Sequence, residues 1–272
     1  MSHESRDAEK KACYWRPFRL SLRRRSAPGI STIQLQKKFP EQVFSRNATM
    51  RHAERFRAVM NFQPVDRLPR WEWAMWWDQT IARWHGEGLP VDKQGVFDIH
   101  AYFGLDPYIQ FWFSTTDPTI EASQHHVEGI VSNMDDYARL RPRLLPDHSA
   151  AIKGMAPWFA RQEKGDAVVW ITLEGYFWFP RTLMGFEKLM FAYYDQPELL
   201  HRINQDLLDF NLQLLDMVAA QGRPVFMTVA EDMSYNNGPM VSREICDEFM
   251  TPYYQKRVYL KLLNEYVTGT WQ

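Results

Sequence analysis

The chain has 272 residues, of which 45% are hydrophobic and 24% charged, and its formal net charge is −1. These proportions are ordinary for a globular domain with a real core, and no run of about 18 apolar residues predicts a membrane span. The polar first residues do not resemble a secretory signal, and Cys13 and Cys246 lack metal-ligand spacing, which predicts two free thiols in a reducing cytoplasm.

The first 49 residues differ in charge from the rest of the chain. They hold 11 lysines and arginines against 4 acidic residues, whereas residues 50–272 hold 21 against 29. The run Arg23-Arg24-Arg25 is the clearest basic cluster. We interpret residues 1–49 as a disordered basic leader, or as translated sequence upstream of a start at Met50, in preference to a nucleic-acid arm or a targeting peptide. Residues 50–272 are then the folded domain.

The domain is expected to open with a helix over residues 49–60, because Ala53, Phe56 and Met60 share one face of it. Residues 67–73 then predict a short first strand. High β propensity over 108–114 and 127–131 predicts a hairpin. Further short or helical elements are expected, in chain order, over 78–85, 97–103, 135–140 and 148–164.

The second half alternates buried strands with helices. The apolar run over 168–173 is typical of a strand buried on both faces, and 224–230 predicts another. Helices are expected over 182–194 and 197–220, and Ser242 is a candidate N-cap for one more. This alternation predicts parallel βαβ units of an α/β fold, in a doubly wound sheet or a barrel. No glycine-rich fingerprint follows a strand, which disfavours the dinucleotide-binding version.

Several motifs, in order and at similar spacing, resemble uroporphyrinogen-decarboxylase-like proteins. They are NFQPVDRLP at 61–69, WHGEGLP at 84–90, YFGLD at 102–106 and the stretches 175–203 and 231–254. The resemblance covers about residues 50–266 and implies a (β/α)₈ TIM barrel. Since members run well past 300 residues, we expect an incomplete barrel of about four βα units here, truncated at the C-terminus.

One motif departs from the pattern that the resemblance implies. The tetrapyrrole decarboxylase has Arg-Gln-Ala-Gly-Arg-Tyr after its first strand, and those arginines hold substrate carboxylates. This chain has AMWWDQ at 74–79, which is aromatic and acidic. The family's methyltransferase branch binds zinc through residues late in the barrel and uses corrinoids. Those residues would lie beyond residue 272, so we expect no cofactor in this chain itself.

Candidate site residues follow from the rule that barrel chemistry collects at the C-terminal ends of strands. The expected catalytic acids are Glu174, Glu231 and Asp232. The alternative is that each acid caps the following helix or pairs with an arginine. The expected substrate-binding residues are Glu72, Trp73, Trp76, Tyr176 and Arg181. Arg181 would either clamp a substrate anion or neutralise Glu174, and we expect no metal ligands.

The resemblance therefore implies an enzyme like uroporphyrinogen decarboxylase, acting on a tetrapyrrole or another carboxylate. The alternatives are a relative of the cobalamin- or coenzyme-M-linked methyltransferases, or an inactive truncated product. The expected partner is a small-molecule substrate, with no nucleic acid and no membrane, in the cytoplasm. Open barrel edges would favour a homodimer or other self-association.

Overall fold

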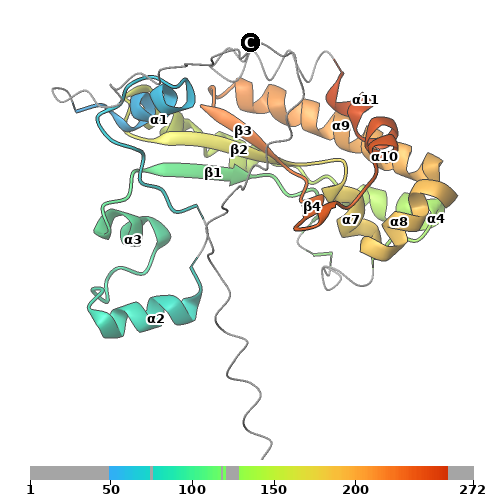
Figure 1. The fold of residues 1–272 in the computed structure, drawn as a ribbon, viewed down its shortest axis with the longest axis horizontal. Helices are drawn as coiled ribbons and strands as arrows, with labels where there is room; N and C mark the ends of the chain where they lie inside the picture. Colours follow the sequence, from blue (N-terminus) through green and yellow to red (C-terminus); the bar gives the residue numbers. More distant parts are fainter. Residues whose placement is uncertain (1–48, 74–75, 118, 121–128, 257–272) are drawn as a thin grey trace, which may run out of the picture. The chain divides into compact units, whose positions relative to one another are not determined.

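The computed structural model describes residues 49–256 except 74–75, 118 and 121–128. Contacts divide the chain into residues 1–40 and residues 41–272, and all described residues belong to the second unit. That unit is a mixed α/β structure (Figure 1). The proposed leader, residues 1–49, lies almost entirely outside the described residues. No helix in the described ranges is long and apolar enough to cross a membrane.

Three parallel strands form the central sheet. They are β1 (Tyr108–Trp112), β2 (Val168–Glu174) and β3 (Phe226–Ala230), in that order across the sheet. Val168 pairs with Tyr108 at one edge, and Trp170 pairs with Phe226 at the other. The predicted parallel pairing of 168–173 with 224–230 is confirmed. The described strands do not close into a barrel.

The predicted hairpin over 108–114 and 127–131 is not seen among the described residues, where β1 pairs in parallel with β2 and residues 129–131 have no strand assignment; residues 127–128 lie outside the described residues. Its β-branched and aromatic residues gave the right propensity, but propensity does not choose a partner. The predicted first strand is wrong, because residues 67–73 have no strand assignment. Pro69 removes one backbone donor. The segment instead meets the start of β1 at two points, where Asp106 N–H donates to the Arg70 carbonyl at 2.8 Å and the Tyr108 hydroxyl to the Glu72 carbonyl.

Helices precede, connect and follow the strands. They are α1 (His52–Met60), α2 (Asp78–Glu87), α3 (Val96–Tyr102), α4 (Met134–Leu140), the 3₁₀ turn η1 (Arg141–Arg143), α5 (Ser149–Lys153), α6 (Ala156–Glu163), α7 (Trp178–Met184), α8 (Phe186–Asp195), α9 (Pro197–Ala219), α10 (Arg243–Phe249) and α11 (Thr251–Tyr254). A small antiparallel pair, β4 (Ser234–Tyr235) with β5 (Gly238–Pro239), follows β3.

Two predicted helices are each divided in two. The expected helix over 182–194 begins earlier and breaks at Gly185, whose φ of 76° lies in the left-handed region that glycine tolerates. The expected helix over 148–164 breaks between α5 and α6. Gly154 ends α5, and Pro157 stands in the first turn of α6. Ser242 caps α10 as predicted, since its hydroxyl accepts from Ile245 N–H at 3.3 Å.

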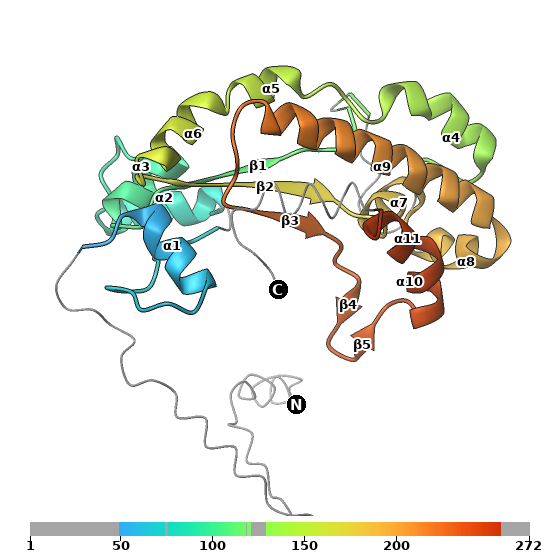
Figure 2. The ribbon, with the colours of Figure 1, turned by 90° about the horizontal axis from the view of Figure 1, so that it is seen from above.

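The two faces of the sheet are covered differently. Val169, Ile171 and Leu173 of β2 point into the main core, beneath α5, α6 and α9. Val168 and Trp170 point the other way, into a small cluster with α1. Figure 2 shows α5, α6 and α9 together on one side of the strands and α1 on the other, beside the start of the strands.

Candidate functional site

A polar row crosses the sheet on the face opposite α9. Gln110 donates its side-chain N–H to the Thr172 hydroxyl at 2.7 Å, and the hydroxyls of Thr172 and Thr228 lie 2.7 Å apart. Because side chains alternate along a strand, these three residues share a face with Trp112 and Glu174, which stand two residues further along β1 and β2. Polar groups thus accumulate toward the C-terminal ends of the strands, on the face that α9 does not cover.

Glu174 is the buried acid of this face. It is the last residue of β2, and only 7% of its surface is exposed. Its carboxylate accepts from the indole N–H of Trp112 at 3.3 Å and from the hydroxyl of Thr115. Burial raises the pKa of Glu174 above its usual value, although these two donors oppose the shift. The residue is thereby biased toward a protonated acid that can give up its proton.

Trp112 is a partly exposed neighbour of this acid. Its indole N–H donates to Glu174, and 45% of the surface of Trp112 is exposed. The ring also approaches Trp178, at 6.1 Å between centroids. The Glu174 carboxylate therefore has two hydrogen-bond donors of different kinds, the indole of the exposed Trp112 and the hydroxyl of the buried Thr115.

Glu231 has a different role. Its carboxylate accepts from the backbone N–H groups of Tyr176 and Phe177 at 2.9 Å and of Trp178 at 3.1 Å, and from the Tyr254 hydroxyl. Burial raises the pKa of Glu231, and the four donors oppose the shift. The four donors fill its acceptor directions, and three of them belong to the turn that leads into α7, a helix that precedes Glu231 in the chain. Glu231 therefore does not cap the helix that follows it, α10, whose N-cap is Ser242.

Gly175 makes this arrangement sterically possible. A Cβ at that position would lie 2.2 Å from the carboxyl carbon of Glu231, closer than atoms can approach. The glycine after β2 is therefore required by an acid 56 positions later.

Arg181 and Asp232 form an ion pair. The buried guanidinium donates to the Asp232 carbonyl at 3.1 Å and to its carboxylate at 3.3 Å, and it lies over the Trp178 ring at 4.7 Å. Asp232 adopts a φ of 44°, and its carbonyl oxygen and its Oδ2 both accept from the guanidinium. The idea that Arg181 neutralises Glu174 is wrong, because its acidic partner is Asp232.

Of the other predicted binding residues, Tyr176 follows Glu174 by two positions, whereas Glu72, Trp73 and Trp76 belong to the segment between α1 and α2. Tyr176 is fully buried, stacked on Tyr253 at 5.2 Å between ring centroids. Glu72 lies beside the first residue of β1, at the opposite end of the sheet, where its charge acts on His100 and Tyr108. Trp73 is 67% exposed, and Trp76 packs edge-on against Trp84 and His100. Of the predicted site residues, those that lie at the ends of β2 and β3 or in the helix after β2 are therefore Glu174, Tyr176, Arg181, Glu231 and Asp232.

The motif at 61–69 has a structural explanation. The buried Arg55 of α1 donates to both carboxylate oxygens of Asp66 at 2.7 Å. Arg67 donates to both oxygens of the buried Asp106 at 2.9 and 2.7 Å. These two bidentate pairs fasten α1 and the segment after it to the start of β1. Asp66 and Arg67 of this motif thus hold the fold together.

Sequence reasoning missed Gln110, Trp112, Thr115, Thr172 and Thr228. A signal was present in the sequence. Gln110 and Thr172 are each a polar residue in an otherwise apolar run, two positions from Trp112 and Glu174 and therefore on the same strand face as these. The missing step was to place 108–112 in the sheet. No group of three His, Cys, Asp or Glu that could hold a metal occurs within the described ranges.

Neither a protein-family model, nor a curated protein, nor a solved structure matches this chain.

Proposed function

We propose that this chain forms three neighbouring strands of a uroporphyrinogen-decarboxylase-like barrel and acts as a carboxy-lyase on a tetrapyrrole or smaller carboxylate substrate. The observation that carries the proposal is the buried Glu174, at the C-terminal end of β2 on the polar face of the sheet. Chemistry in (β/α)₈ barrels collects at that end of the strands.

The arrangement of helices supports a barrel over a doubly wound sheet. β1, β2 and β3 are neighbours in chain order, and α5, α6 and α9 from the two crossovers lie on one side (Figure 2). A doubly wound sheet places crossover helices on both faces and reverses its strand order at the ligand site. A barrel places them all outside and keeps the inner face for side-chain layers.

The reaction assigned to Glu174 is proton delivery. As the bond between the substrate carbon and its carboxylate breaks, CO₂ leaves and the electron pair stays on the carbon. The protonated carboxyl of Glu174 donates its proton to that carbon and is afterwards reprotonated from water. Thr115 and Trp112 hold the carboxyl in place, and their hydrogen bonds stabilise the carboxylate left behind.

The partners follow from the same proposal. A small molecule would reach Glu174 past Trp112, on the polar row of Gln110, Thr172 and Thr228. Within the described sheet β1 and β3 are edge strands, and such edges favour pairing with another chain. We therefore include self-association through these edges in the proposal.

A ligand screen and a CO₂-release assay test the function together. Uroporphyrinogen and a panel of small di- and tricarboxylates are added to the protein, and the melting temperature and released CO₂ are recorded. We expect at least one carboxylate to raise the melting temperature and to release CO₂. Glu174→Gln should keep the binding and lose the release by a factor of about 10²–10⁴. Glu163→Gln, on the outer face of α6, is the matched control. An absence of CO₂ from the unmodified chain, or full activity of Glu174→Gln, contradicts the proposal.

A further inference from the structure

An unpartnered stripe of side chains runs along α8. One face of this helix packs into the core through Leu189, Ala192 and Tyr193. The opposite face exposes Glu187, Phe191, Tyr194 and Asp195, which follow each other at helical spacing. Phe191 is 62% exposed and Tyr194 is 74% exposed. Two large rings side by side in water are an unusual surface for a helix that has a well-packed inner face.

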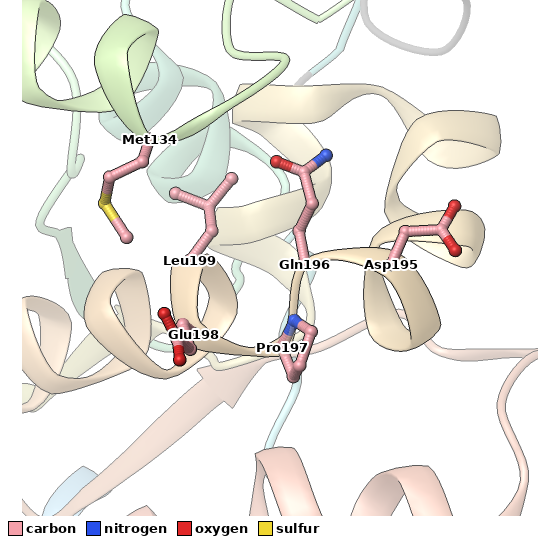
Figure 3. A pocket seen from close by; sticks show the side chains of 6 residues that line it. All are labelled: Met134, Asp195, Gln196, Pro197, Glu198 and Leu199. Carbon is pink, nitrogen blue, oxygen red and sulfur yellow. The ribbon is translucent and has the colours of Figure 1, made fainter.

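The stripe leads into a pocket at the junction of α8 and α9. The pocket has a volume of about 370 Å³ and is lined by Met134, Asp195, Gln196, Pro197, Glu198 and Leu199 (Figure 3). Met134, Pro197 and Leu199 give it an apolar lining. In Figure 3 the carboxylates of Asp195 and Glu198 lie on either side of Pro197. The Gln196 amide is already engaged, donating to the Ser132 carbonyl at 3.0 Å.

The charge of the surface is mainly negative. Glu187, Asp195 and Glu198 have no ion-pair partner within the part of the chain that the structure describes. Lys188, the cation of α8, donates to the Ser132 hydroxyl at 3.0 Å. Three carboxylates thus surround two exposed rings and a small apolar pocket.

We infer that this surface docks a basic, amphipathic segment of a partner protein. An apolar side chain of the partner would pack on Phe191 and Tyr194. A neighbouring lysine or arginine would place its aliphatic stem on Met134 and Leu199 and its charged end between the carboxylates of Asp195 and Glu198. The Tyr194 ring offers a cation a further favourable contact.

Other occupants fit the charges less well. A second copy docked through the same patch would bring the same three carboxylates against each other. A nucleic acid or an anionic membrane would meet the same repulsion. A basic protein segment satisfies the carboxylates and covers the rings at once.

Two labelled peptides test the inference. One is a short amphipathic peptide of lysine and leucine, and the other has glutamate in place of lysine. Fluorescence anisotropy at low and high salt measures their binding to the full chain. We expect the lysine peptide to bind, the glutamate peptide not to bind, and salt to weaken the complex. Phe191→Ser with Tyr194→Ser should weaken binding by about tenfold or more, and so should Asp195→Lys with Glu198→Lys.

The control separates this surface from acidity in general. Glu163→Lys with Asp216→Lys makes the same charge change on exposed positions of α6 and α9. It should leave binding within about twofold, because exposed charges more than a Debye length away are largely screened. All altered side chains are exposed, and circular dichroism checks that each variant folds. Equal losses in the control and the α8 variants overturn the inference, as does any self-association that Phe191→Ser with Tyr194→Ser abolishes, since that assigns the surface to a second copy.

A photo-cross-linker gives an independent measurement. Benzoylphenylalanine replaces Phe191 in one sample and the exposed Phe97 of α3 in another. We expect the lysine peptide to cross-link at position 191 and not at position 97. Equal cross-linking at both positions overturns the inference, because the peptide would then bind without regard to the surface.

Discussion

The hydroxyl of Thr115 donates to the carboxylate of Glu174, joining the loop after β1 to the last residue of β2. Both residues are buried. Thr115→Val keeps the shape of the side chain and removes the donor, so the acid loses one of its two side-chain hydrogen bonds. We expect a loss of about 1–3 kcal/mol in the free energy of unfolding, measured in urea at neutral pH. Thr116→Val, one position along and less buried, is the comparison, and an equal loss there would contradict the assignment.

Glu174 should also make stability depend on pH. Its pKa is raised in the folded state, from a usual value of 4.5. The folded protein therefore holds this proton more tightly than the unfolded chain. The stability that the protonated acid contributes is fully present below pH 4.5 and is lost as the pH rises through the folded pKa. Unfolding in urea from pH 4.5 to 8 should show this loss in the unmodified chain. Glu174→Gln cannot titrate, and a parallel pH profile in that variant would count against the prediction.

Gly175 and Glu231 should be energetically coupled. Gly175→Ala places a Cβ against the Glu231 carboxylate and should cost about 2–4 kcal/mol. Glu231→Ala leaves three backbone donors of residues 176–178 without their acceptor and should cost a similar amount. In the double variant the overlap is gone. Its loss of stability should therefore be smaller than the sum of the two single losses by about 1–3 kcal/mol. Simple additivity in the double-mutant cycle would show that the two residues do not share this contact.

Asp66 should dominate acid sensitivity at α1. The Arg55 guanidinium beside Asp66 holds the pKa of that carboxyl well below its usual range. The pair therefore contributes stability that is present above the unfolded pKa of about 3.8 and lost as the pH falls toward the folded value. We expect Asp66→Asn to lower stability at pH 7 and to flatten the profile between about pH 5 and pH 2. Asp166→Asn, at an exposed carboxyl, should leave that profile unchanged.

The sequence predicted the elements better than their partners. The continuous apolar run of β2 indicated a strand buried on both faces, and β2 lies at the centre of the sheet. The residues of β1 indicated a strand but not its neighbour, because pairing is decided by contacts distant in the chain. The same distance limit explains the site. The amide groups that bind Glu231, and Arg181, which binds Asp232, both lie more than 50 residues earlier in the chain. The pattern around residues 231–232 could not predict these partners.

The cap that Glu231 provides has a consequence for the order in which the protein is made. The amide groups of residues 176–178 leave the ribosome more than 50 residues before the carboxylate that receives them. Until β3 has been synthesised and has docked on β2, those donors have only water to bind. The Tyr254 hydroxyl arrives later still, 23 residues after Glu231. The turn after β2 therefore reaches its final form only after both distant groups have emerged, and a pause in translation between residues 178 and 231 would prolong the time that the turn spends incomplete.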